Sequence, residues 1–280
     1  MTKVLFNVNN MAMKRSLFTW AIQALLVMPA LASALHGCER APSDGAEWTP
    51  IFDGRSLDGW TPKISGEALG FDRRKTFQVH DGILSVNYDN YNEFGNDFGH
   101  LFYNTKLSDY RLKFEYRFTG VQAVGGADWA ILNSGVMLHA QDPSTMASNQ
   151  GFPVSVEAQL LAAFDSAPLR TTANICTPGT HVKISGELIT DHCINSETQA
   201  ARVDEWSLFE VDVKGGQSAE LFIDGQPALT LTALQLDPDD FDARPLIGDE
   251  LTLPSGFIAL QSESHPVEFR NILLLDRTNK

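Results

Sequence analysis

Four polar side chains are predicted to share one face of two neighbouring strands. In the segments 133–139 and 154–160, apolar residues alternate with Asn133, His139, Glu157 and Gln159. Because successive side chains of a β-strand point to opposite faces, these four groups are expected on one surface while the apolar residues enter the core. Two amides, an imidazole and a carboxylate on one sheet face make a candidate sugar site. The alternative is an ordinary antiparallel strand pair with one solvated face.

A third segment, 111–118, alternates most regularly, with apolar side chains on one face and charged side chains on the other. Arg117 lies on the charged face and is a candidate for holding a sugar. Its alternative role is an ion pair with Glu115 or Glu157 on the surface. Trp129, just before the Asn133 strand, can stack on a sugar or pack in the core.

The segment 256–265 brings three more candidates for substrate binding. Gln261 opposes two core-facing aliphatic residues of its strand, and Glu263 and His265 follow at the strand end. All three are expected to approach the site from a neighbouring strand. His265 precedes Pro266, so its alternative role is that of a turn residue.

The elements that must position these groups are strands. Strand-like runs separated by turn signals cover 77–79, 83–86, 111–118, 134–139, 154–160, 206–213, 220–223, 228–231, 256–261 and 267–275. Long helical periodicity is absent after residue 38, and no βαβ alternation occurs. The expected fold class is therefore all-β, a sandwich or jelly roll of two packed antiparallel sheets, in one domain over 48–276.

Composition limits the class of partner. The chain has 43% hydrophobic and 20% charged residues, which is typical of a globular protein, and its net charge is −14. Because nucleic-acid binding depends on clustered Lys and Arg, a nucleic-acid partner is not expected, and a neutral or polar solute fits better. No stretch has the EF-hand spacing, so no metal or cofactor is expected; the alternative is a divalent cation bound to this acidic chain.

The N-terminus is typical of an exported protein. Lys14 and Arg15 precede an apolar run from 17 to 35, which indicates a signal peptide over 1–38. Residues 35–38 resemble the lipobox of bacterial lipoproteins, which predicts lipidation at Cys38, a tether over 39–47 and attachment to the outer membrane facing the periplasm, since Glu39 is not the aspartate that retains such proteins at the inner membrane. The alternatives are a soluble periplasmic or secreted protein, released by cleavage after Ala34, or an uncleaved anchor.

Three cysteines leave one over after any pairing, and Cys38 is the natural odd one. Cys176 and Cys193 are then expected to form a disulfide in an oxidising compartment, worth about 3 kcal/mol on the chain-entropy estimate. The competing interpretation is a zinc site of these two cysteines with His181 and His192. It is disfavoured because adjacent residues of an extended chain point in opposite directions.

The chain resembles the 3-keto-disaccharide hydrolase domain family, whose fold is a concanavalin-like β-sandwich. The resemblance rests on stretches in a fixed order along the chain: Phe52 to Trp60, Gln78 to Leu84, Asn133 to Val136, Glu157 to Gln159, Asp204 to Trp206, Leu260 to Gln261 and Phe269 to Ile272. It covers nearly all of residues 48–276. The region 162–166 departs from the family pattern, which leaves the rim contacts and the substrate preference open.

The resemblance implies cleavage of glycosides whose C3 hydroxyl has been oxidised to a ketone. A C3 ketone acidifies the C2 proton, so a base can remove it and the enolate can expel the C1 oxygen. In the resulting hypothesis His139 or Glu157 is the base, and Arg117, Asn133 and Gln159 hold the sugar and the developing oxyanion. Gln261, Glu263 and His265 assist from the neighbouring strand, and His192 is a further candidate acid beside the disulfide.

Two other functions compete with this hypothesis. A sandwich of this kind can bind carbohydrate without turnover, as a lectin-like module does. It can also hydrolyse ordinary glycosides, although the strand around Glu157 lacks the second and third acids of the Glu-x-Asp-x-x-Glu pattern in laminarinase-type sandwiches.

Overall fold

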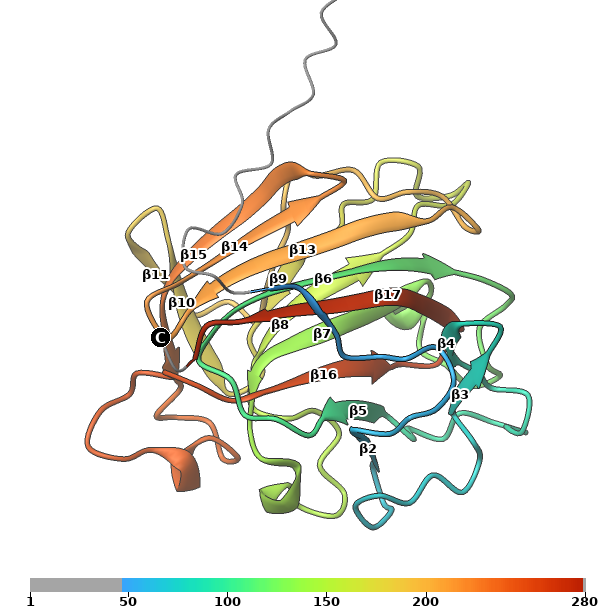
Figure 1. The fold of residues 1–280 in the computed structure, drawn as a ribbon, viewed down its shortest axis with the longest axis horizontal. Coiled ribbons are helices and arrows are strands. Elements are labelled where there is room, and N and C mark those ends of the chain that lie inside the picture. Colours follow the sequence, from blue (N-terminus) through green and yellow to red (C-terminus); the bar gives the residue numbers. More distant parts are fainter. Residues whose placement is uncertain (1–46, 279–280) are drawn as a thin grey trace, which may run out of the picture. The chain divides into compact units, whose positions relative to one another are not determined.

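The computed structural model describes residues 47–278, which form two β-sheets packed face to face (Figure 1). Every strand pair in both sheets is antiparallel. Within this described part there is no α-helix, and none of its helical turns is long and apolar enough to cross a membrane. The predicted all-β, concanavalin-like sandwich is confirmed.

The larger sheet has ten strands. In spatial order they are β11 (Glu187–Ile189), β10 (Thr180–Ile184), β15 (Gln226–Leu236), β14 (Ser218–Ile223), β13 (Ser207–Lys214), β6 (Asp109–Phe118), β17 (Val267–Asp276), β4 (Ile83–Val86) and β3 (Phe77–His80), while β1 (Thr49–Pro50) also pairs with β17. The predicted strands of the 111–118, 206–213 and 267–275 regions all lie side by side here.

The smaller sheet has seven strands and carries most of the predicted site residues. Its spatial order is β12 (Cys193–Ile194), β9 (Asn174–Cys176), β8 (Val156–Leu161), β7 (Asn133–Ala140), β16 (Phe257–Ser262), β5 (Gly99–Tyr103) and β2 (Trp60–Ile64). Three short 3-10 turns complete the described elements: η1 (Asp128–Ala130), η2 (Pro143–Thr145) and η3 (Arg244–Leu246). The strand at β5 was not predicted from the sequence.

The main hydrophobic core fills the space between the sheets. Leu112, Phe114, Tyr116 and Phe118 of β6 enter it from one side, as the alternation in 111–118 predicts. The core-facing residues of β7, β8 and β16 enter it from the other side. The opposite face of the seven-stranded sheet is here called its outer face, and Asn133, Glu157, Gln159 and Gln261 belong to that face.

Alternation in β7 breaks at a β-bulge. Met137 pairs with Ala259, yet Ala140 pairs with Phe257, so β7 holds one extra residue between these two pairs. His139 occupies the bulge with a φ of 48°. Met137 and Ala140 therefore share a small apolar cluster on the outer face, and the side chain of His139 is turned away from it.

The predicted signal peptide, the lipidation site at Cys38 and most of the tether over 39–47 lie outside the described residues. These features stay predictions.

Candidate active site

A row of polar side chains crosses the outer face of the seven-stranded sheet from one strand to the next. Strand register aligns Lys63 with His100, His100 with Gln261, Gly135 with Gln159, and Gln159 with Asn174. Leu260 pairs with Val136, which places Gln261 beside Gly135. The row thus joins residues from six strands. It includes Gln159 of β8 and Gln261 of β16, which the sequence analysis predicted separately.

Gly135 is the one position in this row without a side chain, and Glu157 uses the space. A Cβ added at Gly135 would lie 2.4 Å from Glu157 Oε1 and 2.8 Å from its Cγ. The carboxyl of Glu157 therefore leans over Gly135, toward the Gln261 side of the row.

A cavity of about 350 Å³ opens over this part of the face. Its lining is Trp129, Asn133, Phe152, Glu157, Gln159, Cys176, Pro178, His192, Cys193 and Glu263. Such a volume lies within the range of small-molecule sites. Five of the predicted site residues line it together, namely Asn133, Glu157, Gln159, His192 and Glu263.

Glu157 and Glu263 form a pair of buried carboxyl groups at this cavity. Their residues are 5% and 3% exposed. Burial raises the pKa of Glu157 well above its usual range, and the Gln261 amide beside it opposes the shift. Burial also raises the pKa of Glu263, the neighbouring Glu157 charge raises it further, and Arg170 opposes the shift. Each carboxyl group therefore resists ionisation beside the other, so one can serve as an acid while the other, once ionised, serves as a base.

Arg170 is a site residue that the sequence analysis missed. Its Nη1 donates to the backbone carbonyl of Ile131 at 2.5 Å, just before β7 begins, and its charge acts on both Glu263 and His265. Arg170 lies in an irregular segment without periodicity, so no local pattern marks it. Its partners are distant in the sequence.

His100 was also missed, although a signal was present. In the segment 99–103 it alternates with the core residue Leu101, so a strand assigned there would have placed it on the outer face. Burial lowers the pKa of His100 to about 3, and the nearby charge of Lys63 lowers it further. His100 is therefore neutral at any working pH.

Buried polar atoms without a hydrogen-bond partner concentrate in this region. They include both ring nitrogens of His100 and His265, both amide atoms of Gln261, Asn133 Oδ1 and Glu263 Oε2. An unpaired buried polar group costs about 1–3 kcal/mol, and native structures place such groups where a ligand or water completes them. The concentration makes this face a candidate binding site for a polar molecule.

Gln261 and His265 are close to the cavity without lining it. Gln261 is fully buried beside Glu157, and His265 is packed edge-on against Phe118, with ring centroids 6.1 Å apart. Burial lowers the pKa of His265 to about 4, and the positive charge of Arg170 lowers it as well. Gln261 can therefore orient the carboxyl of Glu157, while His265 packs against the core beside the cavity.

The predicted position of His139 on this face is wrong. The bulge turns its ring into the interior, where Nδ1 lies 3.1 Å from the carbonyl oxygen of Leu253 and Nε2 lies 3.1 Å from that of Ser108. Its ring centroid is 5.8 Å from that of the core residue Tyr110. This environment suits a structural histidine.

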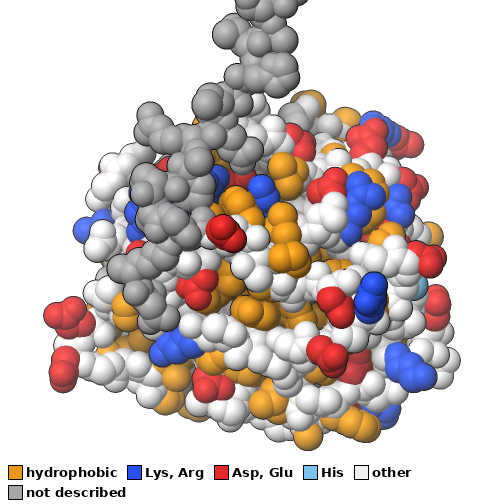
Figure 2. Space-filling view, in the orientation of Figure 1, with side chains coloured by type: hydrophobic (Ala, Val, Ile, Leu, Met, Phe, Trp, Pro, Cys, Tyr) orange, Lys and Arg blue, Asp and Glu red, His pale blue; other side chains and the backbone are white. Residues whose placement is uncertain are grey.

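The predicted position of Arg117 at the site is also wrong, because β6 belongs to the other sheet. Its Nε donates to Glu268 Oε2 at 2.7 Å, and its guanidinium lies 4.6 Å from the ring centroid of Trp206. These contacts belong to the outer face of the ten-stranded sheet. In the orientation of Figure 1, Figure 2 shows acidic and basic side chains interspersed with apolar ones.

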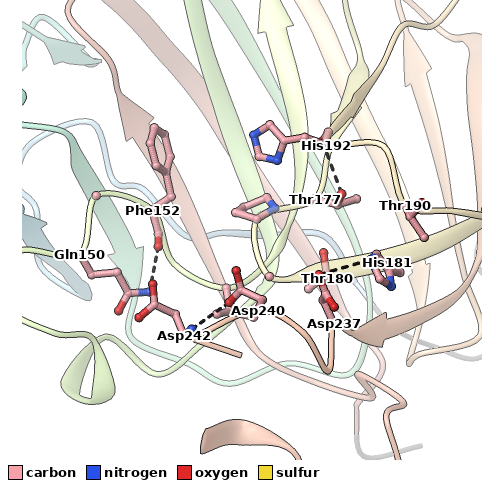
Figure 3. A pocket seen from close by; sticks show the side chains of 14 residues that line it. Gln150, Phe152, Thr177, Thr180, His181, Thr190, His192, Asp237, Asp240 and Asp242 are labelled. Carbon is pink, nitrogen blue, oxygen red and sulfur yellow. Dashed lines mark hydrogen bonds and ion pairs between the residues drawn. The ribbon is translucent and has the colours of Figure 1, made fainter. Parts of the chain in front are cut away.

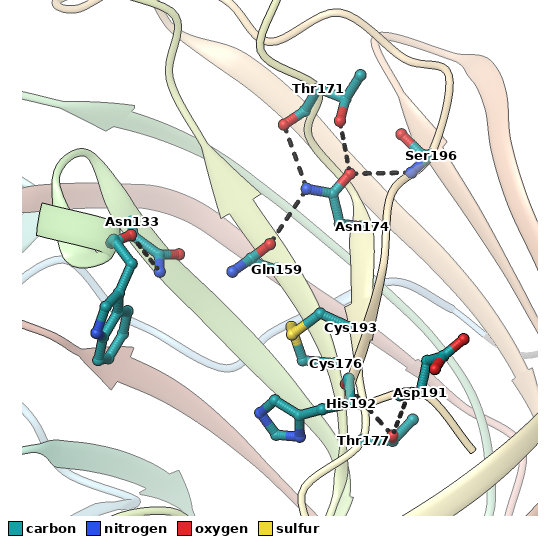
Figure 4. The surroundings of a disulfide bond; sticks show 11 residues. Asn133, Gln159, Thr171, Asn174, Cys176, Thr177, Asp191, His192, Cys193 and Ser196 are labelled. Atoms are coloured by element: carbon teal, nitrogen blue, oxygen red, sulfur yellow. Dashed lines mark hydrogen bonds between the residues drawn. A yellow bond between two sulfur atoms is a disulfide. The ribbon is translucent and has the colours of Figure 1, made fainter. Parts of the chain in front are cut away.

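The predicted disulfide between Cys176 and Cys193 is present, and it forms part of the cavity wall. Figure 4 shows it beside His192, with Gln159 on the adjacent strand. The zinc alternative is therefore wrong, since both sulfurs are bonded to each other. Among residues 47–278 no three His, Cys, Asp or Glu side chains are grouped as metal ligands.

A second cavity, of about 400 Å³, adjoins the first and shares Phe152, Pro178 and His192 with it. Figure 3 shows His192 across from Asp237 and Asp240 in this acidic cavity. Nε2 of His181 lies 3.4 Å from an Asp237 oxygen in this cavity.

The family assignment follows from the match along the chain. The model of the 3-keto-alpha-glucoside-1,2-lyase-like domain matches residues 47–275. The chain belongs to this family. The chain is therefore a carbohydrate-acting protein of the glycoside hydrolase type, and the predicted family resemblance is confirmed.

Solved structures share the fold of this 3-keto-alpha-glucoside-1,2-lyase-like chain at low sequence identity. A protein of Parabacteroides distasonis, provisionally assigned as a glycosyl hydrolase, is 18% identical with a TM-score of 0.51, over 82% of this chain and 93% of its own. A second structure with that assignment, from the same organism, is 17% identical with a TM-score of 0.47, over 81% and 98%. A carbohydrate-binding module of Bacillus subtilis is 9% identical with a TM-score of 0.45, over 78% and 96%. No curated protein is a detectable sequence relative.

Proposed function

We propose that this protein cleaves 3-keto-glycosides by eliminating the C1 substituent across the C1–C2 bond. The observation that carries the proposal is the buried carboxyl pair of Glu157 and Glu263 at a cavity whose floor holds unpaired polar groups. The family description, which names a 1,2-lyase acting on a 3-keto-glucoside, supports this chemistry.

In the proposed reaction Glu157 takes the proton from C2. The electrons of the C2–H bond form the C2–C3 double bond of an enolate, whose negative charge lies on the C3 oxygen. The enolate then collapses: the C3 ketone is restored, a C1–C2 double bond forms, and the bond between C1 and the leaving oxygen breaks. The leaving oxygen receives a proton from Glu263, because burial and the neighbouring Glu157 charge raise the pKa of Glu263 and keep its carboxyl protonated. Addition of water across the new double bond would complete a hydrolysis.

Hydrogen-bond donors near the pair can stabilise the enolate oxygen. The amides of Asn133 and Gln159 line the cavity, and the Arg170 guanidinium supplies a positive charge close to Glu263. Preorganised donors of this kind act strongly in a site from which water is excluded. Arg170 takes the role that the sequence analysis gave to Arg117.

The test is to incubate the purified protein with methyl 3-keto-α-glucoside and to follow methanol release. Release from the ketone, with none from methyl α-glucoside, is the expected result. Release from the unoxidised sugar at a similar rate would instead favour ordinary glycoside hydrolysis, for which two carboxyl groups also suffice. Binding of the ketone without release at any pH would favour the lectin-like alternative.

The proposed elimination needs no cofactor, because the C3 ketone itself acidifies the C2 proton. Dialysis against a chelator is expected to leave the rate of release unchanged. Loss of the rate, restored by a single added divalent ion, would establish the cation alternative.

We also propose that the protein is exported and anchored through a lipid on Cys38, facing the periplasm from the outer membrane. The disulfide beside the site supports an oxidising compartment. Fractionation of cells that express the Cys38→Ala variant tests the anchor: the wild-type protein should stay with the outer membrane and the variant should not. A variant that stays with that membrane would contradict it.

A further inference from the structure

A third cavity, of about 580 Å³, adjoins the candidate active site, and it also shares Gly151 and Phe152 with the acidic cavity. It shares Trp129 and Phe152 with the active-site cavity. A molecule whose sugar ring occupies the active site can therefore extend past these two side chains. This third cavity is called the aromatic cavity below.

Four aromatic residues line this cavity, and no charged side chain belongs to it. Phe94, Phe98, Trp129 and Phe152 contribute rings, and Asn96 and Asn149 contribute amides. The absence of charge is notable in a chain with a net charge of −14. The acidic cavity, by contrast, is lined by three aspartates and two histidines. The two neighbours of the active site thus suit chemically different groups.

Trp129 supplies a flat surface for stacking. It is 55% exposed, and its ring lies nearly parallel to that of Phe98, with an interplanar angle of 13° and centroids 6.1 Å apart. Phe98 is held in turn by Phe152, at a centroid distance of 4.9 Å. An exposed aromatic side chain at a cavity wall, with one face of its ring packed against another aromatic residue, is typical of a surface on which a ligand ring stacks.

We propose that the aromatic cavity is the leaving-group subsite and that it takes aromatic aglycones. This inference rests on the proposed function, since it assigns the reacting sugar ring to the cavity of Glu157 and Glu263. An aryl or benzyl group leaving from C1 stacks on the face of Trp129 that Phe98 does not cover, in the cavity that Phe152 also lines. The two asparagine amides hold polar substituents of the ring.

The kinetic test compares benzyl and methyl 3-keto-α-glucosides. Both compounds lose an alkoxide rather than a phenolate, so a difference between them does not arise from a phenolate leaving group. The wild type should have the higher kcat/KM for the benzyl compound. Trp129→Ala should raise KM for the benzyl compound and so lower its kcat/KM by about tenfold, the range of an aromatic contact. The loss of kcat/KM for the methyl compound, which lacks that contact, should be several-fold smaller. Phe241→Ala is the matched control, because Phe241 is a 77% exposed aromatic residue outside all three cavities.

A binding measurement separates this inference from the proposed function. Benzyl and methyl α-glucosides, both unoxidised, are titrated into wild type and Trp129→Ala by calorimetry, which requires no turnover of a ketone. Selective loss of benzyl binding in Trp129→Ala supports the subsite even if no 3-keto-glycoside is cleaved. An equal effect of the variant on benzyl and methyl compounds, or no effect on either, overturns it. Selective loss in Asp242→Asn instead would assign the aglycone to the acidic cavity and would overturn it as well.

Discussion

Glu157 and Glu263 differ from the other carboxylates of this acidic chain in having almost no exposure and no cationic partner in direct contact. The carboxylate of Glu268, by contrast, lies in an ion pair with Arg117. Burying two carboxyl groups together is costly unless they share a proton. The buried pair of Glu157 and Glu263 lies at the candidate active-site cavity, and both residues line that cavity.

Replacing the base should therefore affect rate far more than folding. Glu157→Gln keeps the shape and is expected to lower kcat for methyl 3-keto-α-glucoside by about 10² or more, as for other proton-transfer groups. Glu220→Gln, on β14 of the other sheet, is the matched control and should retain the wild-type rate. A Glu157→Gln enzyme with near-normal kcat would show that the base is elsewhere.

The same substitution should change how stability depends on pH. Because the pKa of Glu157 is raised in the folded state, folding retains a proton that the unfolded chain releases above its ordinary value of 4.5. The folded protein thus loses stability as pH rises above about 4.5. Glu157→Gln should melt about 3 °C or more above wild type at pH 8, with a smaller difference at pH 4.5.

Buried imidazoles act in the opposite direction. The pKa of His100 is about 3 and that of His265 about 4, below the ordinary 6.5. Stability that depends on these neutral rings is present above pH 6.5 and is lost as pH falls through 4 to 3.

For the carboxyl pair, a melting curve for Glu157→Gln that stays parallel to wild type from pH 4.5 to 8 would contradict the raised pKa of Glu157.

His139 should be a stability residue. His139→Ala leaves a cavity against Tyr110 and removes a hydrogen bond to a buried carbonyl, so unfolding free energy should fall by about 2–4 kcal/mol in denaturant titrations. At a temperature where the variant is folded, kcat should stay within about twofold of wild type. A hundredfold loss of kcat in a fully folded variant would restore His139 as a candidate base.

The position of the Glu157 carboxyl depends on a glycine in the neighbouring strand β7. Gly135 is opposite Gln159, and the absence of its side chain lets the Glu157 carboxyl cross over β7. The glycine is needed here for close approach, since its backbone is ordinary strand. The position of the reactive carboxyl is thus a property of the strand pair as much as of Glu157 itself.

Gly135→Ala is expected to displace the Glu157 side chain and to lower kcat by about tenfold or more. The clash involves Cγ as well as the carboxyl of a buried side chain, so the unfolding free energy should also fall, by about 1–3 kcal/mol. Gly248→Ala, where an added Cβ meets nothing within 4 Å, is the control and should be neutral. Unchanged kcat in Gly135→Ala would mean that the exact position of the carboxyl has no influence on turnover.

In the molecule as a whole, one sheet face holds the chemistry and the segments at its margin complete the cavity. The disulfide ties the short strand β12 to β9, and His192 precedes β12 at the junction of two cavities. Without that link, β12 would be held by a two-residue pairing. The disulfide therefore stabilises both the fold and one wall of the site.

The double variant Cys176→Ser/Cys193→Ser should lose about 3 kcal/mol of unfolding free energy, the estimate for a loop of this length. Because β12 loosens with it, KM should rise more than kcat falls. Denaturant titration and steady-state kinetics of the variant, and of wild type under reducing conditions, measure both effects. Unchanged KM in both would show that this wall does not contact the substrate.

The order of alternating strands, the sandwich fold, the disulfide and the outer-face position of Glu157, Gln159, Asn133 and Gln261 were accessible from the amino-acid sequence. Each depends on side-chain parity within one strand or on the count of cysteines, both of which are local properties. Two sites were misplaced, for non-local reasons. The bulge at His139 arises from the register with β16, and the distance of Arg117 from the cavity depends on which sheet receives β6.

The pairing of Glu157 with Glu263, and the presence of Arg170 and His100 beside them, were decided only by the tertiary structure. These residues come from segments far apart in the chain, and no spacing relates them. Their pKa values depend on how much water and charge the folded chain leaves around each group. A sequence specifies which faces are polar, but the packing of its strands and loops determines which polar groups lose their solvent and meet in one cavity.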